Sequence, residues 1–275
     1  MIANLGTVLE VVTATDPGMV RSHNEDSIGT NAEIGLAVLA DGMGGYNAGE
    51  VASGIAVAMV TTEMKQALEN EEPHAVDNMG ETLAEKFVRE NSAKANAAIF
   101  QTAKSQPQYA GMGTTLVVAL FFDNRMTVGH IGDSRLYRLR NDVFDQVTRD
   151  HSLLQEQIES GMLTKEQARF SQNKNLVTRA VGIDPEVETE VHTYNVEPGD
   201  IYLLCSDGLS DMVQDEDIHS TLGALQANLP LAAQQLVQLA NDNGGRDNVS
   251  VILVRILADF AVPTGWFAKF RAWFR

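Results

Sequence analysis

The chain has a single cysteine, Cys205, in 275 residues, so it cannot form an intrachain disulfide or hold a zinc ion with several cysteines. Residues 201–204 before it are all apolar, which favours a buried thiol. No apolar run approaches the roughly 18 residues of a membrane-spanning helix. The N-terminus also lacks the basic and apolar segments of a secretion signal. We therefore expect a cytoplasmic protein.

Basic residues are also scarce. There are 20 lysines and arginines against 37 aspartates and glutamates, which gives a net charge of −17. Such a chain repels phosphate backbones, so nucleic acid is not expected as a partner. The same charge repels a phosphorylated substrate, so an enzyme for phosphoesters would need metal ions and an arginine at its site. An acidic surface that only aids solubility explains the composition equally well.

The overall composition is that of a globular enzyme, with 44% hydrophobic and 21% charged residues and no repeat or long linker. We expect one catalytic domain over residues 1–258 and a tail over residues 259–275. Apolar runs rich in β-branched residues predict strands at 7–13, 34–40, 114–122, 126–131, 135–139, 201–206 and 249–256. Helical periodicity predicts helices at about 48–68, 82–103 and 230–241. The strands come in groups rather than in strict alternation with helices, which favours an α+β fold with antiparallel sheets.

Two segments stand apart from this pattern. Residues 153–171 resemble a helical hairpin that is interrupted at Gly161, with Thr164 and Gln167 at the spacing of a capping box. This hairpin is either a lid or a plain connection. The tail predicts an amphipathic helix for a membrane surface or a partner protein, unless it packs on the domain itself. Its aromatic residues at helical spacing are Trp266, Phe267, Phe270, Trp273 and Phe274, and its basic residues are Lys269, Arg271 and Arg275.

Aspartates stand beside glycines at the ends of several apolar runs. These pairs are Asp41-Gly42, Gly132-Asp133 and Asp207-Gly208, while Asp247 precedes the last apolar run and Glu25-Asp26 forms a further acidic spot. Carboxylates that converge at strand ends repel each other, so such a cluster persists only if a cation neutralises it. Oxygen ligands favour Mg²⁺, Mn²⁺ or Ca²⁺. One such pair alone indicates a turn, but the recurrence favours a metal site.

Two ions that share carboxylates, roughly 3.5–4 Å apart, can activate a water for attack on phosphorus. Arg21, close to the acidic spot, is the candidate for binding phosphate oxygens, unless it only forms a surface ion pair. Competing motifs are missing, since the chain has no P-loop, no dinucleotide loop, no His-Glu-x-x-His and no nucleophile elbow. The acidic run 215–217 has a polar, loop-like context that does not suit an aspartyl-phosphate nucleophile.

Five motifs in order resemble those of the bacterial PPM family, the metal-dependent type 2C protein serine/threonine phosphatases. They lie at residues 21–26, 41–45, 132–135, 206–209 and 246–250, and the segments 148–152 and 175–182 resemble those that flank the family's flap. The resemblance covers about residues 5–257. It implies a four-layer αββα sandwich of two packed antiparallel β-sheets flanked by helices, with a metal cluster at one end.

The resemblance also implies a role for each matching residue. Asp41 would bridge two ions, with the carbonyl of Gly42 on the second and with Asp207 and Asp247 on the first. Glu25 would contact the second ion, directly or through water, and Asp133 with Asp207 would hold a third. As catalytic residues, Asp26 would orient the attacking water and Arg21 would bind the substrate phosphate. The hairpin 153–171 would be the flap.

The cofactors implied are two or three Mn²⁺ or Mg²⁺ ions. The implied partners are phosphorylated proteins, the substrates of a bacterial Ser/Thr kinase, and we expect a monomer. Met43 and Tyr46 stand where relatives carry histidine, which leaves His23 or metal-bound water as the source of the leaving-group proton. A small-molecule phosphoesterase with the same metal chemistry is the alternative enzyme. A catalytically silent binding module is a third interpretation, which the retention of the aspartates disfavours.

Overall fold

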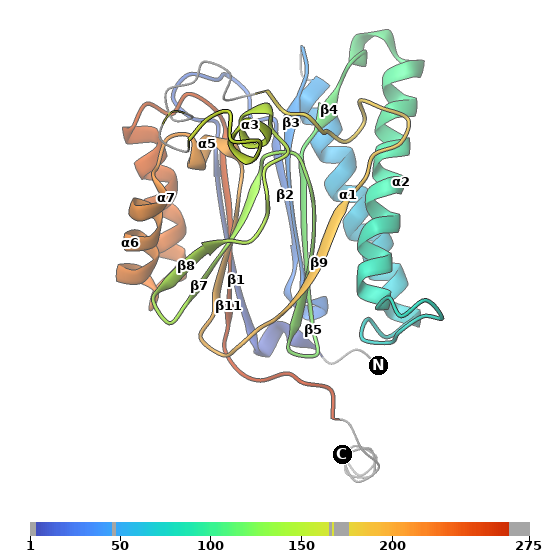
Figure 1. The fold of residues 1–275 in the computed structure, drawn as a ribbon, viewed down its shortest axis with the longest axis vertical. Coiled ribbons are helices and arrows are strands. Elements are labelled where there is room, and N and C mark those ends of the chain that lie inside the picture. The colour runs from blue at the N-terminus through green and yellow to red at the C-terminus, as the bar shows by residue number, and fades with distance from the viewer. Residues whose placement is uncertain (1–3, 46–47, 165–166, 168–175, 264–275) are drawn as a thin grey trace.

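The computed structural model describes residues 4–45, 48–164, 167 and 176–263. Two antiparallel sheets pack face to face, and helices cover the outer face of each (Figure 1). The predicted four-layer sandwich is therefore confirmed. No helix among the residues that the structure describes is long and apolar enough to cross a membrane.

The two sheets contain eleven strands in the described part of the chain. The first sheet has the order β1 (Leu9–Asp16), β11 (Val249–Ile256), β10 (Ile201–Cys205), β7 (Arg135–Arg140), β8 (Val143–Gln146). The second has the order β2 (Asp26–Asn31), β3 (Leu36–Met43), β5 (Leu116–Phe122), β6 (Arg125–Ile131), β9 (Glu190–Asn195), with β4 (Gly113–Thr114) paired to β3.

Helices flank the two sheets on opposite sides. α1 (Ala48–Asn70) and α2 (Leu83–Ser105) cover the second sheet, and α6 (Asp215–Leu225) and α7 (Leu229–Asp242) cover the first. The short helix α5 (Asp207–Ser210) follows β10. α2 begins with a capping box in which Thr82 and Glu85 bond each other's backbone N–H, which ends the preceding loop at a defined residue.

The core is divided by the sheets, and β10 shows how. Ile201, Leu203 and Cys205 pack toward α6 and α7, whereas Tyr202 and Leu204 pack between the two sheets. Successive side chains of a strand point to opposite faces, so a strand covered on both sides is apolar throughout. This confirms the buried position expected for Cys205.

The predicted strands and helices all form, with shifted ends, but some elements were missed. β2, β8 and β9 are three of the four edge strands, and their polar sequences lack the apolar run used for prediction. The acidic run 215–217 is the first turn of α6 rather than a loop. Acidic residues suit that position because they face the positive end of the helix dipole.

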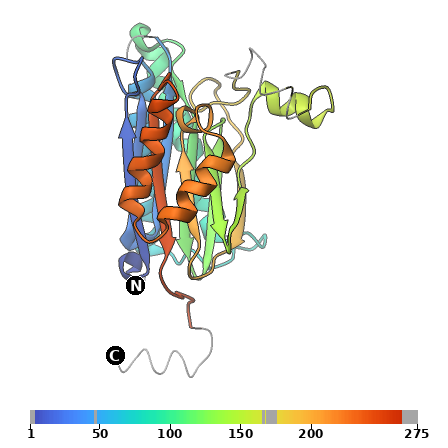
Figure 2. The same cartoon turned by 90° about the vertical axis from the view of Figure 1, so that its left-hand side faces the viewer.

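The expected flap begins as predicted. α3 (Leu153–Glu159) starts at its cap Ser152 and stands away from the sheets (Figure 2). Gly161 has a φ of +73°, which a glycine adopts without strain, so the helix is interrupted there. Thr164 and Gln167 bond each other's backbone N–H, as the capping box predicts. Residues 165, 166 and 168–171 of the expected hairpin lie outside the described residues.

The chain enters and leaves the domain at the same end. Leu9 at the start of β1 pairs with Ile256 at the end of β11, and both ends of the described chain lie toward the bottom of Figure 1. Phe260 packs against the core between the sheets. The predicted amphipathic tail lies outside the described residues from position 264 onward.

Candidate metal centre

The antiparallel topology brings the predicted acidic residues to one end of the sandwich. β2 and β11 begin at this end, whereas β6 and β10 finish there. Asp26 opens β2, Asp133 follows β6, Asp207 follows β10 and Asp247 precedes β11. Asp41, near the end of β3, lies directly opposite Asp26 in the strand register. Residues that are far apart in the sequence therefore converge in one cluster.

Asp41 lies inside a strand rather than after one, because β3 continues for two residues where β4 pairs with it. Its backbone N–H donates to Thr115 Oγ1 at 2.9 Å, and its carbonyl accepts a hydrogen bond from Thr114 Oγ1 at 2.8 Å. A Cβ on Gly42 would lie 2.2 Å from the carbonyl oxygen of Gly49. Only glycine fits there, so the main chain at Gly42 stays close to α1 and to the cluster.

Asp133 lies in the turn that connects β6 of one sheet to β7 of the other, and Asp207 lies where β10 leads into α5. Gly132 has a φ of +103°, a conformation that favours glycine, and it turns the chain so that Asp133 is only 8% exposed. Asp207 is the first residue of α5 and is partly buried. A Cβ on Gly208 would lie 2.0 Å from the carbonyl oxygen of Asn248, so this turn also needs glycine.

Arg21 lies at the edge of the cluster and forms an ion pair with Asp247 at 2.7 Å. Its side chain is 52% exposed, so the guanidinium is open to an incoming group. The ion pair expected for Arg21 is therefore present, and its partner Asp247 is a predicted metal ligand, while phosphate binding by Arg21 stays a prediction. Burial raises the pKa of Glu25, and the nearby Arg21 partly opposes that rise.

The cluster carries more negative charge than the protein neutralises. Burial raises the pKa of Asp41 and Asp207 well above the ordinary range, and the neighbouring aspartates raise it further. Burial also raises the pKa of Asp26 and of Asp133 to about 6. The carboxylates cannot all be ionised together unless positive charge is added.

The donor set fits hard divalent cations. Ser206 Oγ donates to Asp26 Oδ2 at 2.8 Å, but Asp26 Oδ1 is buried and has no hydrogen-bond partner among the described residues. A buried acceptor without a partner is costly unless a water or an ion satisfies it. Carboxylate and carbonyl oxygens, with no sulfur or imidazole among them, are the ligands that Mg²⁺ and Mn²⁺ prefer.

Asn248 has a function in the site that sequence reasoning missed. Its Nδ2 donates to the carbonyls of Pro17 and His23, and its Oδ1 accepts from the N–H of Glu25. One buried side chain therefore holds the loop that carries Arg21. His23 contributes its carbonyl to this bond while its own side chain is exposed, and Tyr46 lies outside the described residues.

A cavity of 220 Å³ adjoins the cluster at Asp133 and Asp207. Leu154 and Ile158 of α3 form part of its wall, so the predicted flap borders the site.

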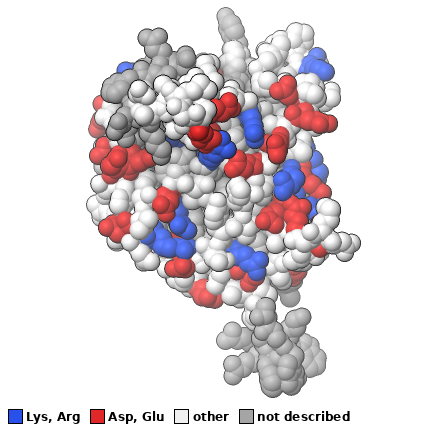
Figure 3. All heavy atoms as spheres, viewed as in Figure 1, with Lys and Arg blue, Asp and Glu red and all other residues white. Residues whose placement is uncertain are grey.

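On the described surface seen in Figure 3, basic side chains lie beside acidic ones in small mixed groups, without the broad basic patch that nucleic-acid binding would need.

Comparison with known proteins identifies the family. The family model described as protein phosphatase 2C matches residues 20–242. The chain belongs to the protein phosphatase 2C family. The serine/threonine phosphatase stp of Listeria innocua is 36% identical to this phosphatase over 243 residues, which are 87% of this chain and 93% of that protein. The serine/threonine protein phosphatase PstP of Mycobacterium tuberculosis is 39% identical over 257 residues, or 93% of this chain but 46% of that longer protein.

Solved structures of the family share the fold. A crystal structure of the Mycobacterium tuberculosis serine/threonine phosphatase PstP/Ppp matches this phosphatase with a TM-score of 0.82 and 37% identity, covering 91% of this chain and 100% of that one. The PstP catalytic domain in complex with two manganese ions matches with a TM-score of 0.79 and 36% identity, covering 91% and 99%. Divalent-metal dependence, which the donor set indicates, is thus supported by the family as well.

Proposed function

We propose that this protein hydrolyses phosphoserine and phosphothreonine in proteins at the acidic cluster, with two or three Mn²⁺ or Mg²⁺ ions. As a member of its family it is a serine/threonine protein phosphatase, a hydrolase. The observation that carries the proposal for the site is the convergence of five aspartates, Asp41 and Asp207 among them, and one glutamate. Among the described residues, neither of these two carboxylates is paired with a lysine or arginine.

The ligands proposed are those that surround Asp41. Asp41 would be shared between two ions, and the other ligands are Asp207, Asp247, Glu25, Asp133 and the Gly42 carbonyl. When bound, the ions lower the pKa of water and screen the charge of the phosphoryl group. Asp133 lies at the cavity side of the cluster, so an ion held there with Asp207 would be the third.

Two residues would act on the reactants directly. The bond from Ser206 holds Asp26 Oδ2, which leaves Oδ1 free to accept a hydrogen bond from the attacking water and to orient it. Arg21 is the exposed cation of the site, and binding of ions at Asp247 would release its guanidinium to hold phosphate oxygens with two parallel hydrogen bonds.

The biological setting follows from the reaction class. We propose that the enzyme acts as a cytoplasmic monomer on proteins phosphorylated by a bacterial Ser/Thr kinase. Residues 1–258 would form the catalytic domain, α3 with the segment after it would be the flap, and the tail at 259–275 would bind a membrane surface or a partner protein.

The test is phosphate release from a phosphothreonine peptide in the presence of Mn²⁺ and then of EDTA. Release that requires Mn²⁺ and stops with EDTA supports the proposal, and a parallel series of small phosphate monoesters separates a protein phosphatase from a metabolite phosphatase. As a control, His192→Leu, which changes an exposed residue outside the cluster, should release phosphate as the wild type does. Release that continues unchanged in EDTA would refute the metal site.

A further inference from the structure

A second group of titratable side chains lies beside the turn that precedes Asp133 of the acidic cluster. His130 on β6, His151 in the connection from β8 to α3, and Glu190 on β9 each offer a ligand atom within 4.8 Å of the others. Both histidines are buried. This composition suits a transition metal, so the geometry of the rings must decide whether one can bind.

The rings do not converge on an ion. His130 and His151 are stacked, with centroids 4.7 Å apart and planes inclined by 12°. A metal lies in the plane of each imidazole that binds it, at about 2.0–2.1 Å for zinc, and two nearly parallel planes share no such point. His130 Nε2 already contacts the carbonyl of Arg149 at 2.7 Å. The group is therefore a hydrogen-bonded network rather than a metal site. The question is which part of the backbone this network fixes.

His151 holds Gly132 at both of its backbone groups. The N–H of His151 donates to the Gly132 carbonyl at 2.9 Å, and the N–H of Gly132 donates to His151 Nδ1 at 3.1 Å. Gly132 immediately precedes Asp133. On its other side Gly132 faces Thr115, whose Cγ2 would lie 2.7 Å from an added Cβ. The turn that aims Asp133 is thus held between a histidine ring and a threonine.

Only one tautomer of His151 makes this contact. Because Nδ1 accepts a hydrogen bond, the proton of the neutral ring lies on Nε2, which faces Glu190 Oε2 at 3.3 Å. Burial lowers the pKa of His151, which favours the neutral ring that the contact with Gly132 requires. Glu190 is itself fixed by its place on β9, opposite His130 in the strand register.

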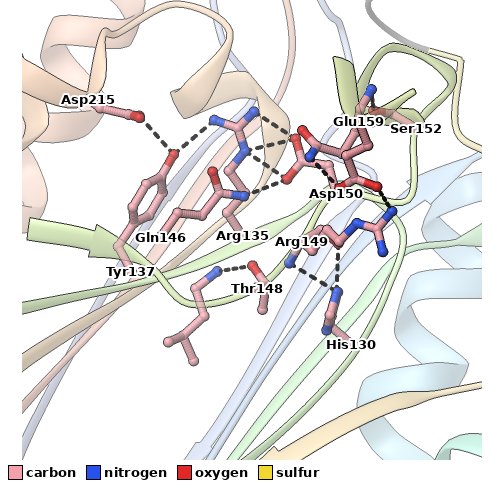
Figure 4. Close-up of polar contacts among 12 residues, drawn as sticks. His130, Arg135, Tyr137, Gln146, Thr148, Arg149, Asp150, Ser152, Glu159 and Asp215 are labelled. Carbon is pink, nitrogen blue, oxygen red and sulfur yellow. Dashed lines mark hydrogen bonds and ion pairs between the residues drawn. The ribbon is translucent and has the colours of Figure 1, made fainter. Parts of the chain in front are cut away.

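The segment that carries His151 is anchored along its length, which Figure 4 shows for most of it. Thr148 Oγ1 accepts from the N–H of Leu136, the backbone of Arg149 contacts His130, and Asp150 accepts three hydrogen bonds from the guanidinium of Arg135. Ser152 caps α3. A ring mounted on such a segment has little freedom to move, so it can fix the turn that it contacts.

We propose that His151 is a positioning residue that holds Asp133 in the orientation for binding a divalent cation, with Glu190 fixing the His151 tautomer. The proposal rests on the proposed function, in which Asp133 is a cation ligand. Residues that orient a metal ligand from behind are worth about 10- to 100-fold in metal affinity when they are removed.

The test is calorimetric titration of the full chain with Mn²⁺, without substrate. His151→Leu keeps the volume but offers no acceptor, and we expect at least a tenfold weaker Mn²⁺ affinity at the site that Asp133→Asn also weakens, with the other sites unchanged. His151→Asn should restore most of the affinity, because its Oδ1 can accept from Gly132. The matched control His192→Leu removes a different partner of Glu190, one bonded at 3.0 Å, and should change nothing.

Three results would overturn the proposal. The first is His151→Leu with wild-type Mn²⁺ binding and only a lower melting temperature. The second is equal weakening of every site, which indicates a general loss of structure. The third is unchanged binding in Asp133→Asn, which refutes the ligand assignment itself while the phosphatase assay tests the activity separately. If His151→Leu does not fold, ¹⁵N imidazole NMR of the wild type decides, since a proton on Nδ1 of His151 excludes the proposed contact.

Discussion

Strand β10 has a buried or partly buried aspartate at each end, and their surroundings are opposite. Asp200, just before the strand, is 1% exposed and accepts hydrogen bonds from Arg140 Nε at 2.7 Å and Arg140 Nη2 at 2.6 Å. Tyr202 OH and the N–H of Glu197 complete its partners. Asp207, just after the strand, lies among other aspartates, and no described lysine or arginine pairs with it.

The contrast separates a structural carboxylate from a functional one. A buried charge is tolerated when the protein supplies a partner with good geometry, as it does for Asp200. A cluster in which Asp41 and Asp207 lack such a partner is unfavourable in the metal-free protein, so it indicates that the missing charge comes from outside the chain. The following predictions test this division, from the largest expected effect to the smallest.

Asp207→Asn should remove a ligand of the proposed ions and lower kcat by at least about 100-fold, because bound cations supply several kcal/mol of transition-state stabilisation. The fold should remain, since one of several mutually repelling carboxylates is lost. Phosphate release and circular dichroism of the same sample measure the two effects. Turnover close to that of the wild type would show that Asp207 has no part in the site.

Asp200→Ala should have the reverse effect. It leaves Arg140 without its buried partner. Breaking such a pair lowers the free energy of unfolding by about 3 kcal/mol, and we take the lower end of the usual range because Arg140 is 20% exposed. Urea denaturation measures this loss, and kcat per folded molecule should stay within about twofold, since the change lies at the far end of the strand. A large loss of kcat without loss of stability would contradict the comparison.

Arg21→Lys should weaken phosphate binding more than chemistry. Lysine keeps the positive charge but loses the two parallel hydrogen bonds of the guanidinium, so KM for a phosphothreonine peptide should rise about tenfold, which corresponds to one charge-assisted hydrogen bond. Steady-state kinetics separate KM from kcat. An unchanged KM would leave the ion pair with Asp247 as the only role of Arg21.

The metal-free enzyme should become less stable as the pH rises through about 6. The pKa values of Asp26 and Asp133 are raised to about 6 in the folded state, above the ordinary aspartate value, so the folded protein binds more protons than the unfolded one in the window between. Melting in EDTA should therefore occur a few degrees lower at pH 8 than near pH 5. Mn²⁺ should raise the melting temperature more at pH 8, and equal Mn²⁺ effects at both values would argue against the acidic cluster as the binding site.

The sequence allowed the central strands and the acidic cluster to be predicted for the same reason. β3, β6, β10 and β11 are buried on both faces and mostly apolar, which makes them recognisable in the sequence. The aspartates mark where those strands meet the end of the sandwich. The edge strands β2, β8 and β9 have mixed polar sequences that resemble loops.

The parts that could not be predicted depend on contacts between distant residues. Asn248 holds a loop more than 200 residues earlier, and His151 holds Gly132 through a ring and a backbone group. No periodicity records such bonds, so both residues were visible only as members of a motif. The position of Asp41 inside β3, rather than after it, likewise depends on pairing with β4, which has only two residues.

The direction of β11 determines how the enzyme could be mounted on a support. The strand runs from the acidic cluster at Asp247 to Ile256 at the opposite end, a span of about 25 Å for eight extended residues. Anything attached beyond residue 263 is therefore joined to the face that points away from the catalytic end. Immobilised on a bead or sensor chip through that end, the phosphatase would present its acidic cluster to the solution rather than to the support.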